Sequence, residues 1–367
     1  MSNEVARSYA AIFDKSRLEL ARAFKATTKT RLAELVGVSA TAITQYETGA
    51  SKPSPVVLVA IADALGQPIE FFGLDGAEHD DLDLQKANFR SLRSTRAMDR
   101  AQATARAYLV SLIVEQMKRF VRFPLFALPD HLHVSDKDNR MVIEKRAAQL
   151  RKEWDIPPGP IVNVVRLLES KGVIVTRCSI ECKSVHAFSK RFRTGPIVVL
   201  DSDKENIDRL RFDAAHELGH LVMHPEIDPG NRIYELQANQ FAAAFLMPEA
   251  DIDAELPSRL DYMRFYRLKQ RWRVSMQALI RRARDLGNIS DSTYRRAMMQ
   301  LSQRGQRTTE SLYPLQGEPE RSTVLARAMN LIEKQGVTVA ELARRARLHK
   351  DFVAETVFDD ELPAVRV

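Results

Sequence analysis

Residues 212–224 read FDAAHELGHLVMH, and this stretch decides what kind of domain the chain can build. It contains the pattern H-E-x-x-H, with two histidines four positions apart. Successive residues of an α-helix turn by about 100°, so His216 and His220 project from one face, one turn apart. Two imidazoles at this spacing can bind one metal ion, usually zinc. Glu217 lies beside them and can act as the general base of a hydrolytic reaction.

A catalytic zinc needs a third protein ligand and leaves one position for water. The best candidate is Glu235, near the start of a second predicted helix that continues to residue 243. The intervening loop, residues 225–232, contains two prolines and a glycine, which allow the chain to reverse. The motif has apolar flanks at helical spacing, and Gly219 inside it would let another segment approach closely.

Three more side chains could take part in this site. His224 continues the four-residue spacing, but it lies about 6 Å beyond His220 along the helix axis. That is far for a tetrahedral zinc already held by two residues on this face, so we expect His224 not to be a ligand. His224, Tyr234 and His186 are alternative donors to a transition-state oxyanion.

These residues resemble the ImmA/IrrE-type metallopeptidases. The likeness joins H-E-L-G-H to E-x-x-A-N-x-F-A at 235–242 and L-M-P at 246–248, with further landmarks upstream at 159–161, 167–169, 172–173, 187–189 and 196–200. It covers about residues 140–300. The resemblance implies a zincin-like fold, a mononuclear site ligated by His216, His220 and Glu235, and proteolysis of a bacterial or phage repressor. Zinc is the expected metal, and manganese also suits such a donor set.

The N-terminal part, residues 17–72, reads as a helical bundle that contains a helix-turn-helix. Helices are predicted at 30–36 and 40–47, with Gly37 in the turn and Ser39 as the cap of the second. The segments G-V-S at 37–39, Y-E-x-G at 46–49 and K-P-S at 52–54 resemble the repressor-type (XRE) helix-turn-helix.

That resemblance implies that one helix enters the major groove of double-stranded DNA and exposes Ala40, Thr41, Thr44 and Gln45. Family members commonly carry Gln at the start of the preceding helix. Here the stretch reads TTKTR, so Lys29 or Arg31 is the candidate phosphate contact. Residues 1–72 hold eight Lys and Arg against seven Asp and Glu, which favours weak DNA affinity. The alternative is a helix-turn-helix used for protein contacts.

The rest of the chain suggests four parts: 1–75, the helix-turn-helix domain; 76–122, an acidic linker and a basic helix; 123–257, the zincin-like domain; and 258–367, a basic helical region. The linker helix carries an arginine stripe at Arg90, Arg93, Arg96 and Arg100. Strands are predicted at 172–176, 185–189 and 196–200. Leu268 to Leu279 and Leu342 to Val353 echo the N-terminal helix-turn-helix, and we interpret both echoes as spacing that helical hairpins share.

Composition limits the classes of protein that remain. The chain has 367 residues, a formal net charge of +7 and 45% hydrophobic residues, as expected for two or three globular domains. It contains no apolar run long enough for a membrane span, and its first residues lack the apolar core of a signal peptide. The two cysteines, Cys178 and Cys182, are too few for a disulfide scaffold. We therefore expect a cytoplasmic protein.

The sequence thus predicts a multidomain, mainly α protein with a helix-turn-helix bundle, an α+β metallopeptidase domain with a small sheet, and a helical C-terminal region. The expected function is a metal-dependent, site-specific endopeptidase that cleaves a repressor-type protein and derepresses genes. One alternative is a DNA-binding regulator whose peptidase-like domain is a sensor, and another is a regulator that acts by binding alone. A homodimer is also an expectation, because such helix-turn-helix proteins often bind two half-sites.

Overall fold

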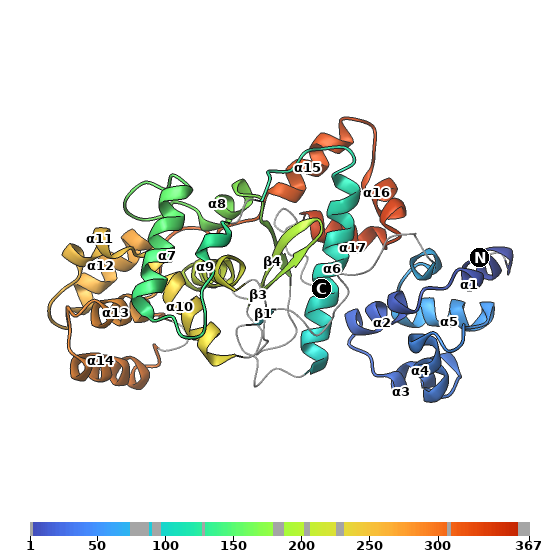
Figure 1. Ribbon diagram of the computed structural model, residues 1–367, viewed down its shortest axis with the longest axis horizontal. Helices are drawn as coiled ribbons and strands as arrows, with labels where there is room; N and C mark the ends of the chain where they lie inside the picture. The colour runs from blue at the N-terminus through green and yellow to red at the C-terminus, as the bar shows by residue number, and fades with distance from the viewer. Residues whose placement is uncertain are drawn as a thin grey trace.

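The computed structural model describes residues 3–73, 88–89, 97–126, 129–178, 187–201, 206–224, 231–306 and 310–358. The chain is mainly helical with one small sheet, as the sequence predicts (Figure 1). Several residues singled out above lie outside the described part of the chain: Arg90, Arg93, Arg96, Cys182 and His186.

The N-terminal domain is a helical bundle with elements α1 Asn3–Ala11, α2 Lys15–Phe24, α3 Lys29–Val36, α4 Ala40–Thr48, α5 Pro55–Leu65 and the 3-10 helix η1 Ile69–Phe72. The helix-turn-helix is formed by α3 and α4. Thr28 and Ser39 cap these helices by accepting a hydrogen bond from an amide in the first turn. Gly37 takes a φ of 72° between them, a conformation that glycine adopts without steric cost. Leu32 and Ile43 are fully buried and hold the two helices together.

A small sheet forms the middle of the molecule, with strands β1 Asn88–Phe89, β2 Ile174–Cys178, β3 Ala187–Phe192 and β4 Gly195–Asp201. The strand order is β1-β3-β4-β2. Strand β3 is antiparallel to both of its neighbours, and β2 is parallel to β4. The short strand β1 comes from the segment after the N-terminal domain, and it places Asn88 opposite Ser189.

The two faces of the sheet pack against different helices. Side chains alternate along a strand, so Val199 points toward α6 Ala97–Met117 while Val198 and Leu200 point toward α9 Ile207–Met223. Two separate apolar clusters result, one on each face of the sheet. The sheet therefore fixes the position of α9, which carries the H-E-x-x-H motif.

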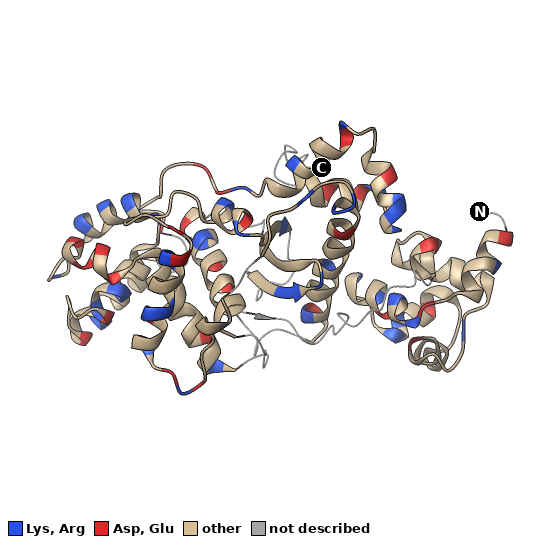
Figure 2. Cartoon of the chain, turned by 45° about the horizontal axis from the view of Figure 1, so that its top comes forward, with Lys and Arg blue, Asp and Glu red and all other residues tan. Residues whose placement is uncertain are grey.

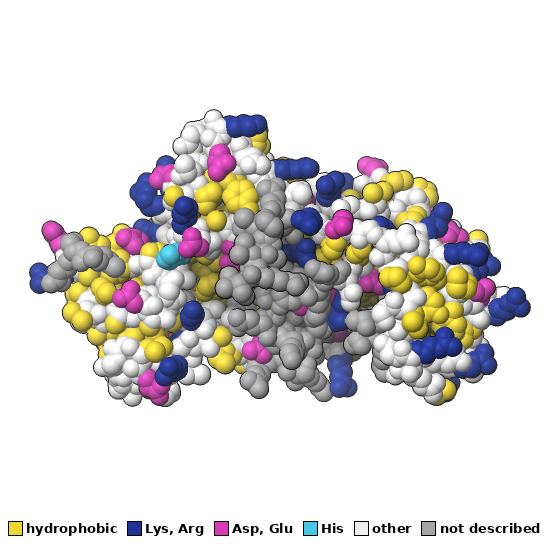
Figure 3. All heavy atoms as spheres, turned by 180° about the vertical axis from the view of Figure 1, so that it is seen from behind, with side chains coloured by type: hydrophobic (Ala, Val, Ile, Leu, Met, Phe, Trp, Pro, Cys, Tyr) yellow, Lys and Arg dark blue, Asp and Glu magenta, His cyan; other side chains and the backbone are white. Residues whose placement is uncertain are grey.

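The cluster on the α9 face contains the helices around the motif. These are α7 Arg140–Glu153, α8 Val164–Ser170, α10 Arg232–Leu246, α12 Tyr262–Trp272, α13 Met276–Asp285 and α14 Asp291–Gln303, with the short elements η2 Asp130–Leu132, α11 Glu249–Ile252 and η3 Asp253–Glu255 beside them. Figure 2 marks Lys and Arg positions along the backbone at the end of the molecule where α12–α14 lie, and Figure 3 shows Lys and Arg side chains on the surface at that end. Arg282 of α13 reaches back to an ion pair with Glu144 of α7, which ties this end to the core.

The cluster on the α6 face joins α6 to the N-terminal domain and to the last helices, α15 Val324–Glu333, α16 Val339–Ala346 and α17 Lys350–Phe358 (Figure 1). Phe24 of α2 meets Phe352 of α17 edge to face, with ring centroids 5.2 Å apart. The C-terminal region 258–367 thus contributes helices to both clusters. The four-part division made from the sequence stays a prediction.

The helices α16 and α17 form a second helix-turn-helix. Thr338 caps α16 by accepting from the amide of Glu341, and Arg347 at its end takes a left-handed φ of 56°. Leu342 and Val353 are fully buried, as Leu32 and Ile43 are in the N-terminal unit. The sequence echo at 342–353 therefore reflects a shared threonine cap and a shared left-handed turn residue, and the likeness goes further than the common hairpin spacing that we expected.

Candidate metal centre

Helix α9 holds the two histidines of the motif on one face. His216 is fully buried and His220 is 2% exposed, and their Nε2 atoms are 3.1 Å apart. Two zinc ligands at about 2.0–2.1 Å in a tetrahedral arrangement stand about 3.3 Å apart. The separation of the two imidazole nitrogens is therefore close to what a shared zinc ion requires.

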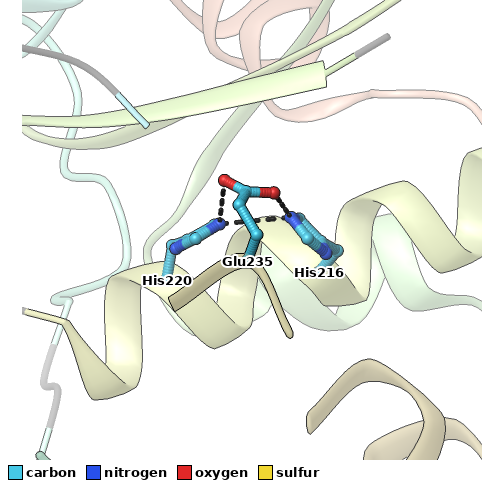
Figure 4. Close-up of side chains that lie close together, drawn as sticks. All are labelled: His216, His220 and Glu235. Carbon is cyan, nitrogen blue, oxygen red and sulfur yellow. Dashed lines mark hydrogen bonds and ion pairs between the residues drawn. The ribbon is translucent and has the colours of Figure 1, made fainter. Parts of the chain in front are cut away.

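Helix α10 brings the third donor. Asn231 caps this helix, and Glu235 follows in its first turn. Its carboxylate lies across the two imidazoles, with Oε2 3.5 Å from Nε2 of His216 and Oε1 3.4 Å from Nε2 of His220 (Figure 4). The three donor atoms lie within 4.8 Å of one another. The structure thus brings together the three residues that the sequence nominates as metal ligands.

Gly219 explains how α10 comes so close to α9. A Cβ atom at this position would stand only 3.0 Å from Cδ1 of Phe241, on the facing side of α10. A larger residue would require Phe241 or the helix that carries it to shift by a few tenths of an ångström. The expectation that this glycine allows a close approach is confirmed.

The charge state of the carboxylate also fits a cation. Burial alone would raise the pKa of Glu235, but the facing imidazoles of His216 and His220 outweigh it and hold the pKa at about 2. The group is therefore an anion at neutral pH, next to two imidazole nitrogens. Two imidazoles and one carboxylate are a donor set of catalytic zinc sites. The described residues of the site fit the metal that the motif implies.

His224 lies behind His220 rather than among the ligands. Its Nδ1 is 3.1 Å from Nδ1 of His220, and its Nε2 is 3.0 Å from Oε1 of Gln237. Gln237 in turn donates from Nε2 to the carbonyl oxygens of Ser135 and Asp138. Burial, with a smaller effect of His220, lowers the pKa of His224 to about 4, so the ring is neutral at pH 7.

The hydrogen bonds that link His220, His224 and Gln237 have one consistent assignment of donors and acceptors. Gln237 offers its oxygen, so the neutral His224 donates from Nε2 and accepts at Nδ1 from the Nδ1–H of His220. The tautomer of His220 that results has its Nε2 lone pair free for a metal. Sequence reasoning missed Gln237, because its position two residues after Glu235 puts it on another face of α10. Tyr234 lies beside His224, with ring centroids 4.6 Å apart.

Glu217, the predicted general base, is fully buried on α9. Ser189 of β3 donates a hydrogen bond from Oγ to its Oε2 at 2.7 Å. The sequence carries no signal for this contact, since the two residues belong to different elements and share no periodic pattern.

The residues predicted to bind DNA lie in the N-terminal unit. Ala40, Thr41, Thr44 and Gln45 are all exposed along α4. Each of the two candidate phosphate contacts forms an ion pair with a carboxylate. Lys29 Nζ is 2.9 Å from Glu47, and Arg31 Nη1 is 3.0 Å from Glu34. The outward face of α4 is therefore exposed, and the DNA-binding roles of its four residues and of Lys29 and Arg31 stay predictions.

Two regions of the chain match known family models. Residues 168–284 match the family model Peptidase_M78, described as the IrrE N-terminal-like domain. Residues 18–72 match the Helix-turn-helix model HTH_3. No curated protein matches the chain, and none of the described helices is long and apolar enough to cross a membrane. The chain therefore combines an XRE-type helix-turn-helix domain with a domain that matches the IrrE-like Peptidase_M78 model.

Proposed function

We propose that this protein is a zinc-dependent, site-specific endopeptidase that cleaves a repressor-type protein and so derepresses genes, with its own domain for double-stranded DNA. The observation that carries the proposal is the cluster of His216, His220 and Glu235, with the Glu217 carboxylate on the same helix. A metallopeptidase needs three protein ligands and an adjacent base, and these four residues are of the types that such sites use.

The roles of the residues follow from their positions. His216, His220 and Glu235 would hold the metal, which supplies Lewis acidity toward a water molecule and a peptide carbonyl when bound. Glu217 accepts the proton of the attacking water and passes it to the leaving amine nitrogen. His224 and Gln237 keep His220 in the tautomer that a metal ligand requires.

Strand β3 supports the choice of an extended polypeptide as substrate. It is the strand nearest the catalytic glutamate, and its outer edge accepts main-chain pairing, since β1 pairs there antiparallel. An extended chain binds such an edge through main-chain hydrogen bonds, while side chains supply specificity. A substrate that binds in this way takes the place of β1.

The N-terminal unit supports the choice of a repressor as target. A peptidase that also binds DNA can meet a repressor on the operator it occupies, or contact the repressor directly. Thr44 and Gln45 on the exposed face of α4 are the residues proposed to read base edges, with Ala40 and Thr41 beside them.

The test combines metal content with capture of the target. Elemental mass spectrometry should find one zinc ion per chain in the wild type and in Glu217→Gln, and much less in Glu235→Ala. Glu217→Gln, which binds but does not cleave, is then used to trap the target protein by crosslinking. The purified target should be cut by the wild type and not by Glu217→Gln. Equal cleavage by both would refute the proposed base, and metal binding without any cleavage would favour a sensor domain.

A further inference from the structure

We propose that Ser189 is a positioning residue that fixes the carboxylate of Glu217 for its work as general base, an inference that rests on the proposed peptidase function. Ser189 is fully buried on β3, and its Oγ stands 2.7 Å from Oε2 of Glu217. The same oxygen is 3.5 Å from the Glu217 carbonyl, which is the weaker partner for the single hydroxyl proton. A distance of 2.7 Å is typical of a hydroxyl that donates to an ionised carboxylate.

Ser189 is a polar side chain in an apolar layer of the core. Ser189 lies on the face of β3 that points toward α9, together with Ala187. Its partner across the ladder is Val198, and Leu200 of β4 lies on the same face. These neighbours are apolar and at most 1% exposed. A hydroxyl buried in an apolar layer costs free energy unless it is hydrogen-bonded, and Glu217 is the acceptor within reach.

The bond assigns different roles to the two carboxylate oxygens. Oε2 accepts from Ser189, and we assign the proton of the attacking water to Oε1. Fixing Oε2 also stops the carboxylate from rotating about its last bond, which keeps Oε1 in one direction. Catalytic groups need such support, because errors of even 1 Å in position can cost about 100-fold in rate.

The position of Ser189 along β3 connects the base to the substrate edge. Asn88 of β1 pairs with Ser189 through the main chain, on the outer edge of the strand. A polypeptide bound at this edge would therefore contact the backbone of the residue that holds Glu217. Binding of an extended chain and orientation of the base then depend on the same strand.

The experiment needs no protein substrate. The zinc is replaced by cobalt, and acetohydroxamic acid is titrated while the visible absorption of the cobalt is followed. A hydroxamate binds the metal and donates its hydroxyl proton to a nearby carboxylate, so its affinity reports where Glu217 stands. Ser189→Ala should weaken the binding about 10-fold, a loss equal to about 1.4 kcal/mol. Glu217→Gln should weaken it at least as much, and metal content should stay unchanged in both.

Two more substitutions separate the hydrogen bond from packing. Ser189→Cys keeps nearly the same volume but donates weakly, so it should behave like Ser189→Ala. Ser189→Thr keeps the hydroxyl and should return the affinity to within about 3-fold of the wild type. Ser322→Ala is the matched control: it removes a serine hydroxyl that lies 2.6 Å from the Val175 carbonyl and 2.9 Å from the Glu169 carboxylate, outside the metal-ligand cluster, and should not change hydroxamate binding.

The outcomes are distinct. Wild-type affinity in both Ser189→Ala and Ser189→Cys, with weak binding in Glu217→Gln, would overturn the role of Ser189. Wild-type affinity in Ser189→Cys with weak binding in Ser189→Ala would assign the effect to volume and would overturn it as well. If Ser189→Ala fails to fold, Ser189→Cys decides alone. Absence of metal from the wild type would instead contradict the proposed function. Once a target is known, Ser189→Ala should lower kcat and leave KM nearly unchanged.

Discussion

Two helix-turn-helix units of the described chain, at residues 28–48 and 338–358, share their helix lengths and their turn, but their second helices make different contacts. Each begins with a capping threonine, continues with a helix of 8 residues and a left-handed residue, and ends with a helix of 9 residues. The fully buried side chains correspond as well, Leu32 with Leu342 and Ile43 with Val353. The inner side of the unit is therefore repeated almost position by position.

The outer side differs between the two units. The four positions proposed to read DNA, which are exposed on α4, correspond in α17 to Lys350, Asp351, Ala354 and Glu355. Within this helix Phe352 packs edge to face on Phe24, and Glu355 lies 3.8 Å from Arg106 of α6. Two of the corresponding side chains are acidic, which opposes contact with phosphate. One backbone unit can thus present a helix to a partner or use it for contacts within the chain.

The largest expected effect tests the shared inner side. Leu32→Ala and Leu342→Ala should each lower the free energy of unfolding by about 2–5 kcal/mol, because both side chains are fully buried. Urea unfolding of the two variants measures this, with the exposed Leu331→Ala as control. A loss below about 1 kcal/mol for Leu342→Ala alone would mean that the C-terminal unit contributes little to the cooperative core.

The next effect tests the outer side. Replacing Thr44 or Gln45 by alanine should weaken binding to a duplex chosen by selection from random sequence by about 1–3 kcal/mol per lost base contact. The corresponding substitutions Ala354→Ser and Glu355→Ala should leave the affinity unchanged. Fluorescence anisotropy at fixed salt measures both. Equal losses of DNA affinity from substitutions in α4 and in α17 would show that both units contact DNA, and would contradict different roles for the two helices.

A smaller effect concerns the residue in the turn. Gly37 and Arg347 both take a left-handed conformation, which costs a non-glycine residue about 1–2 kcal/mol. Gly37→Ala should therefore destabilise the protein by about 1 kcal/mol, since open space surrounds the site and strain is the main term.

Arg347→Gly and Arg347→Ala complete this test. Both remove the hydrogen bond from Arg347 to the carbonyl of Gly73, so their difference isolates the backbone conformation. The glycine variant should be more stable by about 1 kcal/mol, as measured by thermal unfolding. An alanine variant as stable as the glycine variant would contradict a strained turn.

The smallest effect concerns the caps. Thr28→Ala and Thr338→Ala should each cost about 1 kcal/mol, because each threonine accepts a hydrogen bond from an amide of the first helical turn. Thr28→Ser and Thr338→Ser keep the acceptor and should cost only a few tenths of that. Paired thermal denaturation curves would show whether the two caps are equivalent. If Thr338→Ala left the stability unchanged, the cap of the C-terminal unit would not have the role that Thr28 has in the N-terminal unit.

Local patterns predicted the features that depend on local spacing. The four-residue interval of His216 and His220, and the reversal before Glu235, were enough to nominate three residues that the structure places together. The turn at Gly37 and the cap at Ser39 were likewise visible in the sequence and are confirmed.

Contacts between distant elements were not predictable in the same way. Ser189 reaches Glu217 only because the sheet lies on α9, and a hydrophobic pattern does not say which face of a strand meets which helix. The helix α1 was not predicted at all. The split of the C-terminal helices between two clusters depends on the position of α6, which no local signal gives.

The pairing of β1 with β3 has a consequence for how any peptide reaches the site. Asn88 and Phe89 belong to the same chain as β3, so they compete with an incoming strand at an effective concentration that dilution does not lower. A free peptide that pairs weakly would rarely displace them at cellular concentrations. A target held nearby, for example on the same DNA, gains an effective concentration of its own and can compete. Under the proposed peptidase function, the geometry thus favours substrates that are tethered before they are cut.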